Sequence, residues 1–153
     1  MARLEDIPEP TRTAARDIAC PSFESTPFVG GPALSKRRVA LVSSAALIRR
    51  GDKPFPVGSG EHRAVPASWP TADILVSHVS INFDRAGYQR DINVVHPIDR
   101  LHDLAAEGAI GSVAQTHFSV MGSTDPAAMA SAADDIAQAL HADGVDAVLL
   151  CPV

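Results

Sequence analysis

The C-terminal end of the chain places the strongest constraint on its fold. An amphipathic helical pattern leads to Gly144, and residues 145–153 then read Val-Asp-Ala-Val-Leu-Leu-Cys-Pro-Val. A helix, a glycine stop and a short apolar run are typical of the second half of a β-α-β unit. We therefore expect a buried strand that delivers Cys151. Because ligands of open α/β sheets bind beyond the carboxyl ends of the strands, we expect chemistry near this strand end.

The bulk composition indicates one soluble domain and excludes several classes of function. The chain has 153 residues, of which 46% are hydrophobic and 20% charged, and its net charge is −5. Its only basic run is Lys36-Arg37-Arg38, so we expect no nucleic-acid partner. It has no apolar stretch of the roughly 20 residues that span a bilayer and no signal-peptide pattern. With only Cys20 and Cys151, a disulfide framework is not expected and the cytoplasm is the expected location.

The pattern along the chain predicts an α/β fold. Residues 1–35 are rich in proline and glycine and predict an extended arm with a short helix near 11–19. Residues 36–153 predict a single α/β domain. Its strands are expected at 38–44, 73–78, 112–120 and 145–151, its helices at 97–108 and 125–144, and a loop over 51–70. This order predicts a mainly parallel sheet flanked by helices, with Rossmann-like or flavodoxin-like layers, that is incomplete at the C-terminus.

Two of these elements have a predicted burial pattern. The strand at 112–120 should place Ala114, Thr116, Phe118 and Val120 on one face and Gln115, His117 and Ser119 on the other, which we expect to be half exposed or beside a site. The last helix begins with Asp125 as its N-cap, and Met129, Ala133, Ile136 and Leu140 form its expected buried stripe.

Polar residues lie where the predicted strands end. Parallel strands would bring Ser43, Ser44, His78, the segment 119–122 and Cys151 to one edge of the sheet. The alternative is that the serines only cap a strand, and no Gly-x-Ser-x-Gly motif supports a serine hydrolase. Cys151 is either an inert buried cysteine or a thiol that takes part in redox exchange.

A second group of polar residues lies between the second strand and the following helix. Asp84, Asp91 and Asn93 either fix the loop through bonds to the backbone or form the wall of a site for a polar substrate, and both interpretations can hold. His78 and His117 are the more credible functional pair among the six histidines. The chain has no His-Glu-x-x-His motif and no Cys-x-x-Cys pair, so we expect no metal site.

Four stretches of the chain, together with its ending, resemble the selenoprotein B family of the glycine, sarcosine, betaine and D-proline reductases. They are Arg38-Val39-Ala40-Leu41-Val42 with the serines that follow; Asp73-Ile74-Leu75-Val76-Ser77-His78 with Asp84; residues 91–101; residues 108–111 through 117–122; and the ending over 142–150. The resemblance covers residue 23 to the end of the chain. It implies a redox motif, beginning with selenocysteine or cysteine, directly after the last strand.

The resemblance implies a reductase. It places Ser43, Ser44, His78, Asp84, Asp91, Asn93 and His117 around the pocket of an amino-acid-like or betaine-like substrate, with Cys151 as a possible participant and the main nucleophile after Val153. No cofactor beyond selenocysteine is expected, and a thiol/disulfide protein would donate electrons. We further expect that the natural gene continues through a UGA codon and that this chain is an inactive fragment.

Two other functions stay open at this point. The chain could be a non-catalytic protein or subunit that binds a small ligand, or a metal-dependent hydrolase that uses His78, His117 and the aspartates. A fragment that lacks the segment covering its sheet would also expose apolar surface, so we expect a homo-oligomer.

Overall fold

The computed structural model describes residues 3–153 except 18, 20–21, 23, 26–27 and 81–84. Asp84, one of the predicted site residues, therefore lies outside the described residues. The elements along the chain are η1 (Leu4–Asp6), α1 (Thr11–Arg16), η2 (Leu34–Lys36), β1 (Arg38–Ser43), β2 (Leu47–Arg49), β3 (His62–Pro66), η3 (Thr71–Asp73), β4 (Ile74–Val76), α2 (Ala86–Arg90), η4 (Ile92–Val94), α3 (Ile98–Ala106), β5 (Ser112–Val113), β6 (Thr116–Val120), η5 (Pro126–Met129), α4 (Ala130–Ala142) and β7 (Ala147–Cys151). The η elements are 3₁₀ turns.

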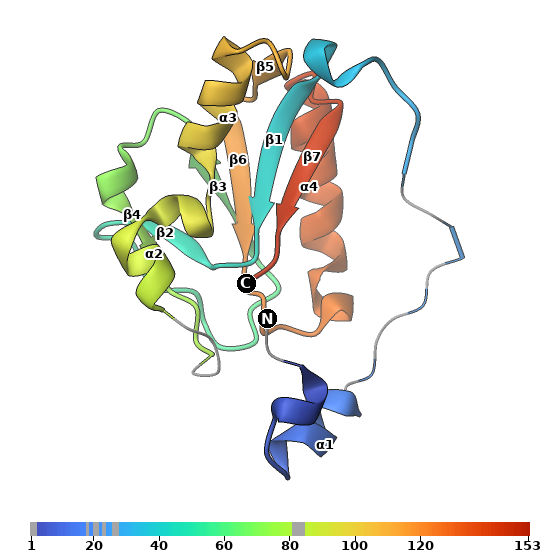
Figure 1. Ribbon diagram of the computed structural model, residues 1–153, viewed down its shortest axis with the longest axis vertical. Coiled ribbons are helices and arrows are strands. Elements are labelled where there is room, and N and C mark those ends of the chain that lie inside the picture. Colours follow the sequence, from blue (N-terminus) through green and yellow to red (C-terminus); the bar gives the residue numbers. More distant parts are fainter. Residues whose placement is uncertain (1–2, 18, 20–21, 23, 26–27, 81–84) are drawn as a thin grey trace.

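The main sheet is built around β1, as its apolar sequence predicts. β1 pairs in parallel with β5 and β6 on one side and with β7 on the other, and β3 adds to β6 as an antiparallel edge strand. Figure 1 shows the carboxyl ends of β1 and β7 meeting at the lower end of the sheet, where the C-terminus lies. The predicted α/β class with a mainly parallel sheet is confirmed.

Helices cover the two faces of this sheet. Ile136 and Leu140 of α4 pack with Ala40 and Phe118 on one face. On the other face, Ile98 and Leu101 of α3 pack in the cluster that contains Val39 and Leu41 of β1. The two faces of the strand at 112–120 are therefore assigned as predicted.

The buried stripe of the last helix differs from the prediction by one position. Asp125 caps the helical segment as expected, because its Oδ1 accepts the Ala127 N–H at 2.9 Å. The first turn is a 3₁₀ turn, in which residues advance by about 120° rather than the 100° of an α-helix. Within α4 the buried residues follow an i, i+4, i+8 spacing (Ala132, Ile136 and Leu140), and Ala133 is exposed.

The predicted strand at 73–78 forms at β4 but not in the main sheet. β4 pairs antiparallel with β2 in a separate two-stranded sheet, yet its carboxyl end stays close to the end of β1, because the Ser77 N–H donates to the Ala46 carbonyl at 3.0 Å. The chain reverses into β2 at Ala46, whose φ is +54°. The predicted loop over 51–70 is also wrong in part, since it contains β3, a short edge strand whose charged residues hide its alternation.

The predicted third strand is divided in two. β5 ends at Val113 and β6 begins at Thr116, while the Gln115 N–H is diverted to the Asp143 Oδ2 at 3.0 Å. Asp143 also accepts a hydrogen bond from the Arg38 guanidinium at 2.7 Å, which fixes the start of β1 to the end of α4.

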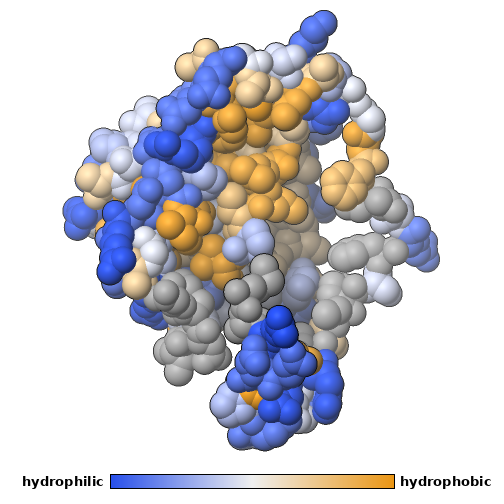
Figure 2. Space-filling model, viewed as in Figure 1, coloured by the Kyte–Doolittle hydropathy of each residue, from blue (hydrophilic) through white to orange (hydrophobic). Residues whose placement is uncertain are grey.

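The last strand forms, but the prediction that it is buried is wrong. β7 is an edge strand in which Val148, Leu149 and Leu150 have 43%, 43% and 68% of their surfaces exposed. Figure 2, which has the same view as Figure 1, shows apolar surface over the middle of the face that is turned to the reader. Within the described ranges, every helix is too short or too polar to cross a membrane.

Candidate functional site

The carboxyl ends of β1 and β7 are held together by Ser44. Ser43 and Cys151 are direct partners across the two strands. The Ser44 N–H donates to the Cys151 carbonyl at 3.1 Å, and the Ser44 Oγ accepts the Val153 N–H at 2.8 Å. Gly122 lies against the same serine, since a Cβ at Gly122 would stand 2.9 Å from the Ser44 Oγ. The structure thus brings together Ser43, Ser44 and Cys151 with Ser119 and Gly122 of the predicted segment 119–122.

Ser43 is fully buried, and its hydroxyl is already used by the fold. It donates to the Val95 carbonyl at 2.7 Å and accepts the Ala45 N–H at 3.2 Å. These bonds fix the loop before α3 to the end of β1. A role for Ser43 in contacting substrate stays a prediction, whereas its role in positioning that loop follows from the geometry.

Ser119, on the neighbouring strand β6, makes a similar connection. Its hydroxyl donates to the Ser43 carbonyl at 2.8 Å and accepts the Leu47 N–H at 2.9 Å. It therefore joins the end of the main sheet to the start of β2.

His117 is fully buried and pairs with a second histidine that the sequence did not indicate. Its Nδ1 accepts the Leu41 N–H at 3.0 Å, because the break between β5 and β6 leaves that donor without a ladder partner. The His117 and His96 rings meet edge to face with centroids 5.5 Å apart. Burial is the main reason that the pKa of each falls from 6.5 to about 4, and each ring is therefore neutral at physiological pH.

One nitrogen of each of these rings has no hydrogen-bond partner among the described residues, namely the His96 Nδ1 and the His117 Nε2. On this face of the predicted strand, His117 and Ser119 are fully buried and Gln115 is exposed, so the half-exposed alternative does not hold for the two residues within β6, and a position beside a site stays a prediction. The pair lies inside the protein and has no direct contact with solvent.

His78 follows β4, the strand of the smaller sheet. It is buried, and its Nδ1 accepts the Ser80 N–H at 3.1 Å. Burial, and secondarily the charge of Arg85, lowers the pKa of His78. Among the described residues, His, Cys, Asp and Glu side chains form no group of three that could hold a metal ion.

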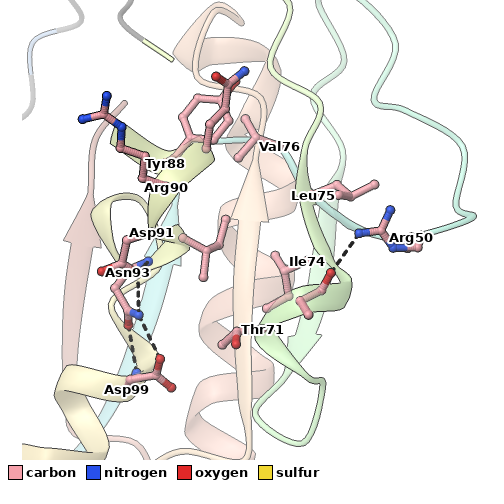
Figure 3. Close-up of a pocket in the computed structure, with 13 residues that line it drawn as sticks. Arg50, Thr71, Ile74, Leu75, Val76, Tyr88, Arg90, Asp91, Asn93 and Asp99 are labelled. Atoms are coloured by element: carbon pink, nitrogen blue, oxygen red, sulfur yellow. Dashed lines mark hydrogen bonds between the residues drawn. The ribbon is translucent and has the colours of Figure 1, made fainter. Parts of the chain in front are cut away.

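An open groove of about 520 Å³ lies between the smaller sheet and the segment from α2 to α3. One wall carries Asp91, Asn93 and Asp99, and Arg50 stands on the opposite side in Figure 3. Tyr88 and Ile92 supply part of its apolar lining. The groove thus has carboxylates and a guanidinium on different walls.

Asn93 organises the acidic wall. Its Nδ2 donates to the Asp91 Oδ1 and to the Asp99 Oδ2, both at 2.9 Å, and its Oδ1 accepts the Asp99 N–H at 3.0 Å. The hydrogen bond from the Asn93 side chain, followed by that from its backbone N–H, lowers the pKa of Asp91. The predicted bonds from these side chains to the backbone of the loop are present: Asp91 accepts the Asn93 N–H at the start of η4, and the Asn93 Oδ1 accepts the Asp99 N–H in the first turn of α3.

The groove and the end of β7 share one apolar cluster. The side chain of Val153 packs in the cluster built on Ala45, Leu47, Val65, Ile74 and Val95, which also includes Tyr88 and Ile92 of the groove. The half-buried Cys151 thiol is a weak nucleophile, because burial raises its pKa.

Sequence reasoning missed His96, Asp99 and Arg50 as parts of these arrangements. The segment 91–101 does carry the signal for the first two, since His96 and Asp99 fall within a stretch already singled out. No local pattern distinguishes Arg50, which reaches the groove only because β2 and β4 form a separate sheet.

Comparisons with known proteins give a consistent result. The sequence model described as glycine/sarcosine/betaine reductase selenoprotein B matches residues 71–153. The D-proline reductase subunit gamma of Acetoanaerobium sticklandii is 35% identical over 120 residues, covering 76% of this chain and 49% of that protein. The glycine reductase complex component B subunit gamma of Carboxydothermus hydrogenoformans is 29% identical over 143 residues, covering 88% of this chain and 32% of that protein.

A third relative, the sarcosine reductase complex component B subunit beta of Peptoclostridium acidaminophilum, is 31% identical over 124 residues, covering 76% of this chain and 28% of that protein. The chain thus spans about half the length of the D-proline reductase relative and about a third of the other two. No solved structure matches the chain.

Proposed function

Because this chain belongs to the glycine/sarcosine/betaine reductase selenoprotein B family, we propose that it forms the substrate-binding part of a reductase subunit for a small zwitterion. The relatives are named for the reduction of D-proline, glycine, sarcosine and betaine, each of which carries a carboxylate and a cationic nitrogen. The substrate class proposed here is an amino acid or betaine of this kind.

The charges of the groove support this substrate class. Arg50 is suited to the carboxylate of the ligand, and Asp91 and Asp99 are suited to its cationic nitrogen. Because Asn93 engages one oxygen of each carboxylate, it fixes their orientation before a ligand arrives. Tyr88 adds an aromatic ring, a group that attracts quaternary ammonium ions.

The observation that carries the proposal is the position of Val153. Its N–H is held by Ser44, and its side chain belongs to the apolar cluster that includes the groove residues Tyr88 and Ile92. The proposal is that a redox motif follows this residue and supplies a selenolate or thiolate, which is a strong nucleophile at neutral pH. A thiol/disulfide protein is the proposed electron donor.

Calorimetric titration of the chain with glycine, sarcosine, betaine and D-proline tests the substrate class. We expect saturable binding of at least one of them and about tenfold weaker binding by Arg50→Gln and Asp99→Asn. Arg16→Gln, an exposed arginine of the arm, is the matched control. Absence of saturable binding by all four compounds would refute the proposed groove.

Reductase activity requires a second test. The chain extended through the downstream redox motif should reduce the bound compound with a dithiol as donor, whereas residues 1–153 alone should bind it without turnover. Turnover by residues 1–153 alone would contradict the placement of the nucleophile after Val153.

A non-catalytic ligand-binding subunit is the second candidate function. Burial raises the pKa of the Cys151 thiol, which agrees with a chain that binds ligand and does not itself reduce it. This candidate would be established if the chain binds one of the four compounds but the chain extended through the downstream motif does not reduce it.

A further inference from the structure

The open edge of β7 is an unusual surface for a parallel sheet. Strands of such sheets are normally covered on both faces, and exposed apolar edges tend to pair with other chains. No charged residue occurs in β7, and Val148, Leu149 and Leu150 are exposed along it. Its second backbone edge has no strand partner among the described residues.

The same chain carries a second exposed apolar segment, in the arm before η2. Phe28 and Val29 have 92% and 84% of their surfaces exposed. They are followed by Gly30 and Gly31, which leave the backbone free to adapt its direction. Phe28 and Val29 are residue types that favour strands.

The base of the arm is fixed next to the start of β7. The Arg37 Nε donates to the Pro32 carbonyl at 2.8 Å, and the Arg37 Nη1 donates to the carbonyl of Asp146, the residue before β7, at 3.4 Å. Figure 1 shows the stretch directly before η2 rising to the upper end of the domain, whereas β7 runs downwards, so the two chain directions are opposite. The direction is suitable for antiparallel pairing.

We propose that Phe28 and Val29 of one copy add as an antiparallel strand to the β7 edge of a second copy, and that the exchange is reciprocal. The Arg37–Pro32 contact fixes the base of the arm, and Phe28, which is 92% exposed, does not pack on the β7 edge of its own chain. A second copy can therefore be reached without breaking that contact. Each copy has one arm and one open edge, so two copies satisfy each other in a closed twofold arrangement.

The interface would combine backbone hydrogen bonds with apolar contacts. β-strand addition uses the free N–H and C=O groups of the edge, and side chains alternate between the two faces. Phe28 would pack on one face of β7 and Val29 on the other. Because two short strands bury less than the roughly 800 Å² per partner of a standard interface, we expect a concentration-dependent equilibrium between monomer and dimer.

Sedimentation velocity of the full chain over a range of concentrations tests the association. The dimer should appear as concentration rises, and Phe28→Ser or Leu150→Lys should raise the dissociation constant at least about tenfold. Val29→Ser should act in the same way, whereas Val57→Ser should not, although Val57 is 83% exposed. A wild-type chain that stays monomeric throughout, or equal effects of the Val29 and Val57 substitutions, would overturn the proposal.

A disulfide experiment shows whether the arm pairs with the β7 edge of a second copy or with that of its own chain. V29C and L150C are introduced into separate, differently tagged copies in which Cys20 and Cys151 are replaced by serine. Exchange predicts that oxidation of the mixture yields the mixed disulfide between the two tagged copies. If the mixture stays uncrosslinked while a chain carrying both cysteines closes on itself as a monomer, the arm belongs to its own β7 edge and the proposal is wrong.

Discussion

The hydroxyl of Ser44 accepts the backbone N–H of Val153 at 2.8 Å, so a side chain directly after β1 holds the second residue after β7 against the end of the sheet. Ser44 also donates its own N–H to the Cys151 carbonyl. Its backbone thus continues the pairing of the two strands, and its side chain extends that pairing by one further contact.

Replacement of Ser44 by alanine should release Val153 without breaking the strand pair. We expect a loss of about 1 kcal/mol in the free energy of unfolding, which is typical of one hydrogen bond, and faster hydrogen exchange at Val153. Urea denaturation and exchange mass spectrometry measure the two effects. Ser131→Ala, on the exposed face of α4, is the control and should leave both unchanged. Unaltered exchange at Val153 in Ser44→Ala would contradict the role assigned to this hydroxyl.

The buried pair of His96 and His117 should make the protein sensitive to mild acid. The pKa of each is lowered to about 4, so between about pH 6.5 and 4 the unfolded chain binds more protons than the folded one. The stability conferred by the neutral rings is therefore complete above pH 6.5 and is lost as the pH falls towards 4. The loss is on the order of 3 kcal/mol per histidine, and the two losses are not additive, because the charges repel.

Urea denaturation at several pH values across this window measures the effect. His96→Leu should flatten the pH dependence, whereas His141→Gln, at an exposed position of α4, should not. Asp91 and Asp143, whose pKa values are held below 3.8, lose their contribution only in stronger acid. A stability that is constant from about pH 6.5 to 4.5 would contradict the burial of two neutral histidines.

The elements whose sequence signals are local could be predicted from the sequence alone. β1 is a continuous apolar run, α4 has a capping aspartate and a glycine stop, and both form where expected. The two faces of β6 also follow from alternation, because Phe118 and His117 necessarily point to opposite sides of a strand.

The parts that could not be predicted depend on non-local pairing. β4 has an apolar sequence like that of a central strand, but only its pairing with β2 shows that it belongs to a second sheet. For the same reason the sequence predicts Asp91 and Asn93 as site residues but not Arg50, which lies in a different part of the sequence and meets them only in the folded groove. The exposure of Leu150 likewise depends on β7 being at the edge of the sheet, which no local pattern reveals.

Substitution of Asn93 should disturb the acidic wall of the groove. In Asn93→Ala, Asp91 loses the side-chain hydrogen bond that contributes most to its lowered pKa, so that pKa should rise towards its usual value. Loss of the bonds to Asp99 should weaken zwitterion binding about tenfold, since the carboxylates are no longer held in place. Carboxyl NMR titration and calorimetry follow these changes. Gln138→Ala, at an exposed position of α4, is the control, and an unmoved Asp91 titration would refute the network.

Cys151 should react slowly with thiol reagents at neutral pH. Burial raises the pKa of its thiol above the usual 9.0, and the reactive thiolate is therefore scarce until the pH becomes strongly alkaline. Alkylation rates measured against pH in a Cys20→Ser background should lie below those of a free cysteine peptide at every neutral pH value. Urea at a denaturing concentration should remove the difference, because unfolding exposes the thiol. A folded-state rate equal to or above that of the peptide would mean that Cys151 is an activated thiol and would return it to the list of candidate nucleophiles.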